Sequence, residues 1–369
     1  MPTPAESVLQ FGSGRFLRAF ADLFIHEARQ AGQDIGRVVV VQSTDTGRAR
    51  LFNDQNGRYR IHVRGIRDGR RISESVQVES VSRALSATQD WEAVLALGRD
   101  PSTEYILSNT SETGYDVPES ERLDGAPPVS FPGKLLGVLL ARYESGGTPV
   151  TVIPCELIDG NAGVLRRLVL SLGRKRRLGG DFLEWMEEGV TWLHTLVDRI
   201  TIEPPPGFPN PDGDGLLALT EPFAFWALED QPEAAPFIEH PAIVRTKDVR
   251  PYALRKVRVL NGAHTALVCR AMPLGIQTVR EAADHAETGP WLRDLMLEEL
   301  VPALPDEVED ARSFAEDCIE RFRNPFLDHR LESIATAHQV KVKLRLVPSY
   351  EAYVEKFQRK PPLLSALLN

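Results

Sequence analysis

One short segment, Arg255–Thr265, contains side chains that together suit carbonyl chemistry. At about 100° per residue in a helix, Asn261 lies about 140° and His264 about 80° around the axis from Lys256. Leu260 falls in the same sector, so this side of the helix is expected to face the core. A desolvated lysine can act as acid or base, and amide and imidazole groups can hold a substrate oxygen. A core histidine beside a lysine that reaches solvent fits the same spacing, so both interpretations stay open at this point.

A second candidate site is a glycine turn near the start of the chain. An extended run over 7–11 precedes Gly12-Ser13-Gly14, and apolar residues at helical spacing follow over 16–28, which predicts strand, turn and helix. Such a turn offers backbone N–H groups to a pyrophosphate. The residues expected to bind the cofactor there are Gly12, Gly14, Arg15 and Phe16. Leu17 stands where a third glycine is usual, so an ordinary strand–helix turn is the alternative.

The choice between NAD and NADP depends on the residues after the second strand. The β-branched run Arg37–Val41 predicts this strand, in the pattern of a parallel strand covered on both faces. An acidic residue near the strand end would bind the adenosine ribose of NAD. Gln42-Ser43-Thr44 comes first, and Asp45 only afterwards. We therefore expect NAD through Asp45, and NADP stays open.

The rest of the sequence predicts the elements that position these two sites. Extended and helical stretches alternate up to residue 200, which is typical of an α/β, doubly wound parallel sheet of the Rossmann type. The extended runs are 105–108, 149–153 and 195–200, and the helical stretches are 91–97 and 135–143. From about residue 248 the pattern changes to long amphipathic helices. We expect two domains: a dinucleotide-binding Rossmann domain over 1–246 and a mainly helical substrate and catalytic domain over 247–369.

Composition excludes several classes of protein. The chain has 369 residues, 42% hydrophobic and 26% charged, as a soluble globular protein does. It contains no apolar run long enough for a membrane span and no signal peptide pattern, so we expect a cytoplasmic protein without membrane partners. The net charge of −9 repels a polyanion and argues against a nucleic-acid partner. The cysteines and histidines are scattered without ligand spacing, so no metal is expected.

Six separated motifs resemble the polyol-specific long-chain dehydrogenases, the mannitol dehydrogenase family. Two of the motifs are Val8–Phe20 and Lys256–Thr265, which contain the two candidate sites. The other four are similar to the sugar-acid branch of that family: Ser108–Gly114, Phe131–Leu135, Pro154–Ile158 and Arg321–Phe326. The motifs follow in the same order through nearly the whole chain. The resemblance therefore favours a catalytic Lys256 over a structural one.

The resemblance implies a metal-free, nicotinamide-dependent reductase with a Rossmann domain followed by a helical domain. Lys256 would be the general acid/base, Asn261 an oxyanion-stabilising donor and His264 a substrate-orienting donor. Asp198 matches an acidic residue of the family near cofactor and substrate. Two residues after the strand at 105–108 are expected near the nicotinamide ribose: Asn109 and Glu112.

The leading hypothesis is reduction of a keto-hexuronate such as tagaturonate to its aldonate, with hydride from NADH and a proton from Lys256. The mannitol branch has Cys-Asp-Asn where this chain has Cys155-Glu156-Leu157, so its second oxyanion amide is missing unless Asn161 replaces it. A sugar acid is thus favoured over a polyol. The alternatives are a mannonate or mannitol-type oxidoreductase and a non-catalytic dinucleotide-binding regulator. The intact lysine, asparagine and histidine set argues against the regulator.

A substrate carboxylate requires a cation, and several arginines lie in or beside the motifs. These are Arg255, Arg258, Arg321 and Arg323, and the sequence does not choose among them. The residues expected to bind substrate are Lys134, Asn161, Arg323 and Asn324. The expected partner is a small-molecule sugar acid, and the expected assembly is a monomer or small homo-oligomer.

Overall fold

The computed structural model divides into two compact units. It describes residues 5–44, 47–110, 112–119, 121, 127–232, 234 and 236–368. Unit 1 comprises Met1–Val63, Glu74–Thr220 and Ala224–Val249, and unit 2 comprises Arg64–Ser73, Glu221–Phe223 and Arg250–Asn369. The last boundary between the two units, between Val249 and Arg250, lies close to the expected boundary at residue 246. Two short segments from the first 246 residues nevertheless group with the C-terminal helices.

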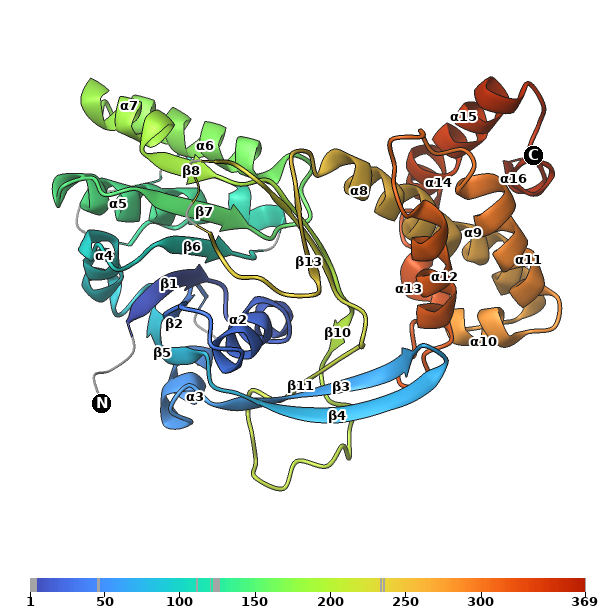
Figure 1. Cartoon of the computed structure of the whole chain (residues 1–369), viewed down its shortest axis with the longest axis horizontal. Coiled ribbons are helices and arrows are strands. Elements are labelled where there is room, and N and C mark those ends of the chain that lie inside the picture. The colour runs from blue at the N-terminus through green and yellow to red at the C-terminus, as the bar shows by residue number, and fades with distance from the viewer. Residues whose placement is uncertain are drawn as a thin grey trace. The chain divides into compact units, whose positions relative to one another are not determined.

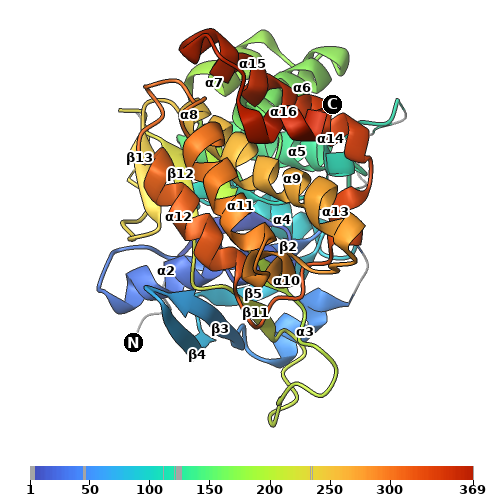
Figure 2. The same cartoon turned by 90° about the vertical axis from the view of Figure 1, so that its right-hand side faces the viewer.

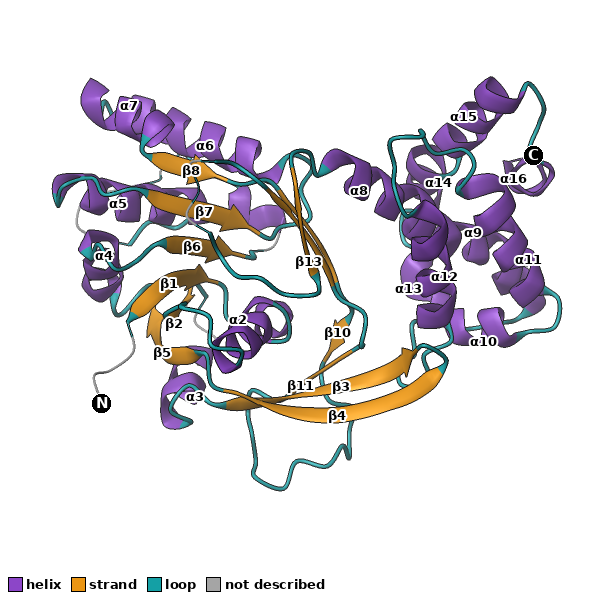
Figure 3. Cartoon of the chain, in the orientation of Figure 1, coloured by secondary structure: helices purple, strands orange, loops and turns teal. Residues whose placement is uncertain are grey.

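Unit 1 is built around a six-stranded parallel sheet with the order β5-β2-β1-β6-β7-β8 (Figures 1 and 3). The strands are β1 (Glu6–Phe11), β2 (Arg37–Gln42), β5 (Val81–Ser86), β6 (Tyr105–Ser108), β7 (Val150–Pro154) and β8 (Val190–Trp192). The chain moves to one side of β1 with β2 and to the other with β6. Open α/β sheets bind ligands at the carboxyl ends of strands beside such a switch point. The predicted doubly wound Rossmann sheet is confirmed.

Helices cover both faces of this sheet. They are α1 (Arg15–Arg18), α2 (Ala21–Gln30), α3 (Arg48–Asp54), α4 (Trp91–Arg99), the 3-10 helix η1 (Glu112–Tyr115), α5 (Phe131–Glu144), α6 (Asn161–Lys175) and α7 (Gly180–Glu188). Val38 and Val40 of β2 belong to one buried layer, and Val39 and Val41 belong to the opposite layer. The run of valines is therefore explained by burial on both faces.

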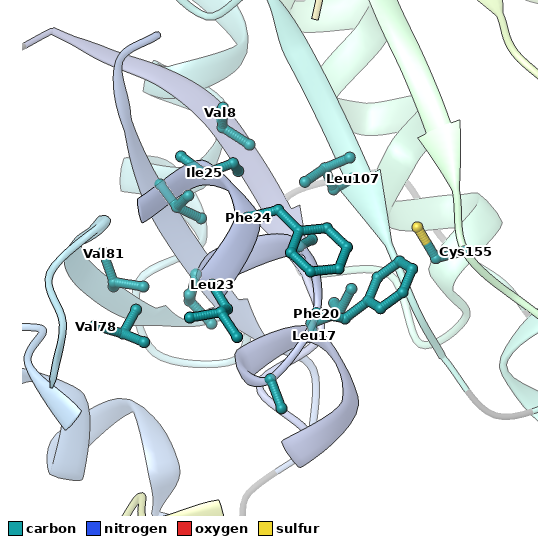
Figure 4. Close-up of a cluster of buried hydrophobic side chains, with 14 of the residues drawn as sticks. Val8, Leu17, Phe20, Leu23, Phe24, Ile25, Val78, Val81, Leu107 and Cys155 are labelled. Atoms are coloured by element: carbon teal, nitrogen blue, oxygen red, sulfur yellow. The ribbon is translucent and has the colours of Figure 1, made fainter. Parts of the chain in front are cut away.

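The helix predicted over residues 16–28 is interrupted, so that prediction is wrong in part. Helix α1 ends at Arg18 and α2 begins at Ala21, with Phe20 between them at φ −129° and ψ −94°. The Phe20 ring packs 4.8 Å from Phe16, 4.7 Å from Phe24 and 5.1 Å from Trp226, between ring centroids. Figure 4 shows Phe20 and Phe24 within this layer. Tertiary packing of Phe20 thus overrides the local helical pattern.

Two smaller sheets complete the strands, and neither was expected. One has the order β10 (Thr201–Ile202), β11 (Ala218–Thr220), β3 (Tyr59–Arg67) and β4 (Arg70–Val78), and the other has the order β13 (Ile243–Thr246), β12 (Phe225–Glu229) and β9 (Thr195–Asp198). The extended run predicted over 195–200 therefore forms β9 in a separate sheet. Strands β3 and β4 are joined at Asp68 and Gly69, whose φ angles of 53° and 70° suit a tight hairpin turn.

Unit 2 is a group of helices, which Figure 2 shows face on. They are α8 (Arg250–Arg255), η2 (Lys256–Asn261), α9 (Gly262–Ala271), the 3-10 helix η3 (Met272–Leu274), α10 (Val279–Asp284), α11 (Thr288–Asp294), η4 (Leu295–Leu300), α12 (Ala311–Phe322), α13 (Leu331–Ala335), α14 (His338–Arg345), α15 (Val347–Phe357) and α16 (Pro362–Leu368). Both η2 and η4 are π-helical turns within longer helical stretches. Among the described residues, no helix has the length and apolar character needed to cross a membrane.

Candidate active site

The two glycines of the turn after β1 serve different purposes. Gly12 has φ +130°, and a Cβ there would lie 2.9 Å from the carbonyl oxygen of Asn109 and 3.1 Å from Leu17 Cδ1. Gly14 is the N-cap of α1, and a Cβ there would meet no protein atom within 4 Å. The fold itself requires glycine at position 12, because φ and space both exclude a side chain. At Gly14 the protein leaves open space beside the backbone, as a cradle for a pyrophosphate requires.

The loop after β6 meets this turn at the carboxyl edge of the sheet. The backbone N–H of Asn109 donates to Phe11 O at 3.0 Å, and its side-chain Nδ2 donates to Cys155 O at 2.7 Å. Asn109 therefore joins the ends of three neighbouring strands. Asp45 lies outside the described residues, and the side chain of Glu112 does too, although the backbone of Glu112 forms part of η1.

Glu156 is a buried carboxylate that sequence reasoning noticed only as a departure from the mannitol branch. It accepts hydrogen bonds from Ser108 Oγ at 3.1 Å, Thr110 N at 2.9 Å and Tyr115 OH at 3.1 Å. Burial is the main cause that raises the pKa of Glu156, and these donors oppose it. Glu156 thus fixes both ends of the loop that contains Asn109.

Arg15 and Phe16 are oriented by contacts within unit 1. Arg15 Nη1 pairs with Glu203 Oε1 at 3.2 Å, and its Nε donates to Thr201 O at 3.3 Å. The Phe16 ring stacks on Phe20. The Arg15 charge is therefore shared with a carboxylate, so its role toward a cofactor stays a prediction.

Asp198 and Lys134, predicted site residues of unit 1, are both buried. Asp198 ends β9 and pairs in register with Phe225 of β12. Lys134 Nζ donates to Val129 O at 2.6 Å, and burial lowers the pKa of Lys134. Lys134 therefore fixes the start of its own helix, and this contact supports a structural role.

Asn161 has its whole amide engaged within the protein. Its Nδ2 lies 3.1 Å from Pro154 O and 3.2 Å from both Glu156 O and Thr195 O, and its Oδ1 accepts from Ala162 N at 2.8 Å. These bonds tie the end of β7 to the start of β9. These contacts support a structural role for Asn161.

The predicted catalytic segment of unit 2 begins with a π-helical turn. Lys256 and Asn261 are the first and last residues of η2, and both are half-buried. In a π-helix, residues five apart are joined by the backbone hydrogen bond that joins residues four apart in an α-helix. Asn261 therefore lies on the same side as Lys256, closer than the 140° that regular α-helical spacing predicts. This is a correction to the predicted geometry, and it strengthens the pairing of the two side chains.

His264 follows on α9 and is held by aromatic contacts. Its ring centroid lies 4.6 Å from Phe322 and 4.9 Å from His329, and the side chain is 8% exposed in relative terms. Burial lowers the pKa of His329, which favours a neutral ring beside His264. His329 was not identified from the sequence, because it follows the last quoted motif and has no spacing relation to His264.

Residues of the Arg321–Phe326 motif contact other segments of unit 2. Arg321 forms a buried two-pronged ion pair with Glu221, with Nε 2.9 Å and Nη2 2.8 Å from the carboxylate oxygens. Asn324 Nδ2 donates to Arg64 O at 3.2 Å, and the Arg64 guanidinium stacks 4.0 Å from the Phe326 ring centroid. The motif thus attaches the two inserted segments of unit 2 to the end of α12 and to the residues that follow it. The Asn324 contact supports a structural role instead of substrate binding.

The arginines proposed for a substrate carboxylate can now be separated. Arg321 forms its ion pair with Glu221. Arg255 is buried, and its Nη1 donates to Glu309 O at 3.1 Å. Arg258 Nη1 makes a longer contact of 3.4 Å to Ser349 Oγ. Arg323 is half-exposed and lies 3.7 Å from Asp284. Arg258 and Arg323 therefore stay as candidates.

The structure brings the predicted residues together in two sets, one in each unit. At the carboxyl edge of the sheet in unit 1 lie Gly12, Gly14 and Asn109, with Glu156 behind them. On η2 and α9 of unit 2 lie Lys256, Asn261 and His264. Within the ranges that the structure describes, no group of three or more metal-ligating side chains is present.

The chain matches known families and proteins over nearly its whole length. Residues 6–240 match the mannitol dehydrogenase Rossmann domain, and residues 248–367 match the mannitol dehydrogenase C-terminal domain. The chain is 36% identical over 388 residues to the altronate oxidoreductase of Bacillus subtilis (strain 168), covering 98% of this chain and 79% of that protein. It is 34% identical over 382 residues to the altronate oxidoreductase of Yersinia enterocolitica, covering 98% of this chain and 78% of that protein.

Solved structures show the same fold. A D-sorbitol dehydrogenase in substrate-free form matches with a TM-score of 0.87 at 23% identity, covering 99% of this chain and 79% of that chain. A Pseudomonas fluorescens mannitol 2-dehydrogenase in a ternary complex with NAD and D-mannitol matches with a TM-score of 0.78 at 21% identity, covering 99% and 78%. Together with the two domain matches, these findings show that the chain belongs to the mannitol dehydrogenase family and is a dehydrogenase that acts on CH–OH groups with a nicotinamide dinucleotide.

Proposed function

We propose that this protein interconverts a keto-hexuronate, tagaturonate, and its aldonate, altronate, with NAD(H). The substrate assignment is supported by altronate oxidoreductases at 33–36% identity over nearly the whole chain. The observation that carries the chemistry is the π turn of η2, which puts Lys256 and Asn261 on one side just before His264.

The residues of unit 1 fit a dinucleotide. The open space beside Gly14 suits close approach of a pyrophosphate to backbone N–H groups, and Gly12 and Asn109 fix the shape of that turn. When bound, the nicotinamide ring accepts a hydride from the alcohol carbon or donates one to the carbonyl carbon. We assign NAD over NADP because Asp45 follows the second strand.

In this proposal, proton transfer is the task of unit 2. Lys256 donates a proton to the substrate oxygen as the carbonyl is reduced, and it accepts that proton when the alcohol is oxidised. The Asn261 amide donates a hydrogen bond to the same oxygen as negative charge develops. His264, fixed between Phe322 and His329, donates to the substrate and limits its orientation. Arg258 or Arg323 would pair with the carboxylate.

The test is a comparison of substrates with the purified protein and NADH. Catalytic efficiency on tagaturonate should exceed that on fructose by at least about tenfold, because a site that pairs with a carboxylate loses a charge-assisted bond to a neutral ketose. Higher catalytic efficiency on fructuronate than on tagaturonate in the same panel would favour the alternative of a mannonate oxidoreductase. Equal or higher efficiency on fructose would contradict the sugar-acid assignment and favour a mannitol-type oxidoreductase.

A further inference from the structure

A buried polar cluster lies directly behind the glycine turn of unit 1. Arg18 of α1 is 2% exposed, and its Nη1 donates to Ser13 O, the middle carbonyl of the turn, at 2.7 Å. Asp22 of α2 is completely buried, and its Oδ2 accepts from Tyr59 OH of β3 at 2.9 Å. The Tyr59 hydroxyl also lies 3.3 Å from Arg18 O. The conformation of the turn therefore depends on Arg18, and the surroundings of Arg18 include the buried carboxyl of Asp22.

Gln10 of β1 links the same carboxyl to the turn. Its Nε2 donates to Gly12 O at 3.1 Å, and its side chain also interacts with the Asp22 carboxyl. In the described part of the chain, Gln10 Oε1 and Asp22 Oδ1 are both buried acceptors that receive no hydrogen bond. A proton on Asp22 converts one acceptor into a donor, which reduces this cost. These two unsatisfied acceptors thus favour a protonated carboxyl, whereas the hydrogen bond that Tyr59 donates favours the ionised form.

Burial of the carboxyl acts in the same direction as the unsatisfied acceptors. Burial raises the pKa of Asp22 to about 7, while Tyr59, Gln10 and Arg18 oppose that rise. Two further charges act on Arg18, those of Glu203 and Arg48, and Asp214 acts on Tyr59. With Asp22 protonated, the cluster presents the positive charge of Arg18 beside the turn. With Asp22 ionised, this charge is neutralised and the carboxylate competes with Ser13 O for the guanidinium.

We propose that Asp22 is a positioning residue for the cofactor, and that the turn binds the dinucleotide diphosphate with Asp22 protonated. This inference rests on the cofactor site of the proposed function. Protein with ionised Asp22 must then take up one proton as NADH binds, and releases it when NADH dissociates. Bound diphosphate stabilises the protonated form in return, because the linkage is reciprocal.

The experiment is NADH titration by calorimetry from pH 6 to pH 9, in two buffers of different ionisation enthalpy. For the wild-type protein, the Kd for NADH should be nearly constant below pH 7 and should rise above it, by up to about tenfold per pH unit. The two buffers at pH 8 should report uptake of up to one proton for each NADH bound.

Three variants test whether the Asp22 carboxyl causes the pH dependence of the Kd for NADH. Asp22→Asn keeps an acceptor for Tyr59 and adds a donor, so its Kd should lose this pH dependence and its proton uptake. Tyr59→Phe removes a bond that lowers the pKa of Asp22, so the rise in Kd should begin at higher pH. Glu203→Gln is the matched control, because Glu203 also acts on Arg18 but is half-exposed; its pH profile should keep the wild-type shape.

Two results would overturn the coupling while leaving the cofactor site intact: a wild-type Kd that is constant from pH 6 to pH 9, or an unchanged profile in Asp22→Asn. A failure of the cofactor site has a different signature. In that case NADH would bind Gly14→Val as it binds the wild-type protein, or would not bind the wild-type protein at any pH.

Discussion

Gly12 and Gly14 of the turn should respond differently to substitution, because a side chain has no room at Gly12 and open space at Gly14. Replacing Gly14 with valine should abolish NADH binding without unfolding the protein, because no protein atom lies near the added Cβ. Replacing Gly12 with alanine should destabilise the fold itself, since the Cβ would press on Asn109 O. Calorimetry with NADH and thermal unfolding of both variants check this. Unchanged NADH affinity in Gly14→Val would place the cofactor elsewhere.

Asp22 should also make stability depend on pH. Burial raises its pKa to about 7 in the folded protein from an ordinary value of 3.8, so between these pH values the folded state retains a proton that the unfolded state has lost. Its contribution to the free energy of unfolding is therefore complete below pH 3.8 and is lost as pH rises to 7.

The difference in unfolding free energy between wild type and Asp22→Asn isolates this contribution. As pH rises from 5 to 8, the wild-type protein should lose on the order of 2 kcal/mol of unfolding free energy relative to Asp22→Asn, as measured by urea unfolding. A difference that stays constant over this range would show that Asp22 has the same pKa in the folded and the unfolded protein.

At the same scale, the sequence identified residues that belong to short local patterns and missed those defined by distant partners. Gly12, Gly14 and Lys256 stand in motifs that can be recognised within a few residues. Asp22 gained importance only through Tyr59, which is 37 positions away. Glu156 accepts a hydrogen bond from Thr110, which is 46 positions away. Such partners meet only when the sheet forms.

Among the elements, the π turn of η2 is the clearest case of a local pattern that sequence reasoning could not resolve. The spacing over Arg255–Thr265 is helical, and it predicts the regular α-helical angle between Lys256 and Asn261. A π turn changes this angle for the residues that follow it. The type of element was therefore predictable, whereas the relation between Lys256 and Asn261 required the structure.

The hairpin of β3 and β4 was missed for a different reason. Strand β3 alternates buried and partly exposed residues, but β4 is exposed along most of its length. A strand without a buried face has no alternating apolar pattern, so only the Asp68-Gly69 turn signalled a hairpin.

The ion pair of Arg321 with Glu221 should dominate the attachment of the Glu221–Phe223 segment to α12. Glu221→Gln leaves a buried guanidinium without its counter-charge, so it should lower the free energy of unfolding by about 3–5 kcal/mol. The matched control is Asp328→Asn, which breaks the exposed pair with Arg280 and should cost less than about 1 kcal/mol. Equal effects of the two substitutions in chemical denaturation would contradict this assignment.

For the whole molecule, the sequence predicted the parallel sheet and the change to helices after residue 248, because both leave repeating patterns. It did not predict that Arg64–Ser73 and Glu221–Phe223 group with the C-terminal helices. Those assignments depend on bonds such as Asn324 to Arg64, which are 260 positions apart. No pattern within a window of neighbouring residues contains that information.

Two residues of the motifs contribute to the architecture of unit 2. Arg321 and Asn324 belong to a motif that resembles the sugar-acid branch, yet their contacts hold segments of unit 2 together. In the proposed function, Lys256, Asn261 and His264 differ from them, because their side chains transfer the proton and orient the substrate. For the whole molecule, we therefore propose that Lys256 supplies the proton of the reaction.

The most direct test of this claim is the kinetics of Lys256→Ala with tagaturonate and NADH. We expect kcat to fall by about 10²-fold or more while the Kd for NADH stays near the wild-type value, and we expect an added primary amine to restore part of the rate. Lys343→Ala, at an exposed lysine of the same unit, should leave both quantities unchanged. A variant of Lys256 that raises KM but retains kcat would contradict the claim, and would make Lys256 a substrate-binding residue instead.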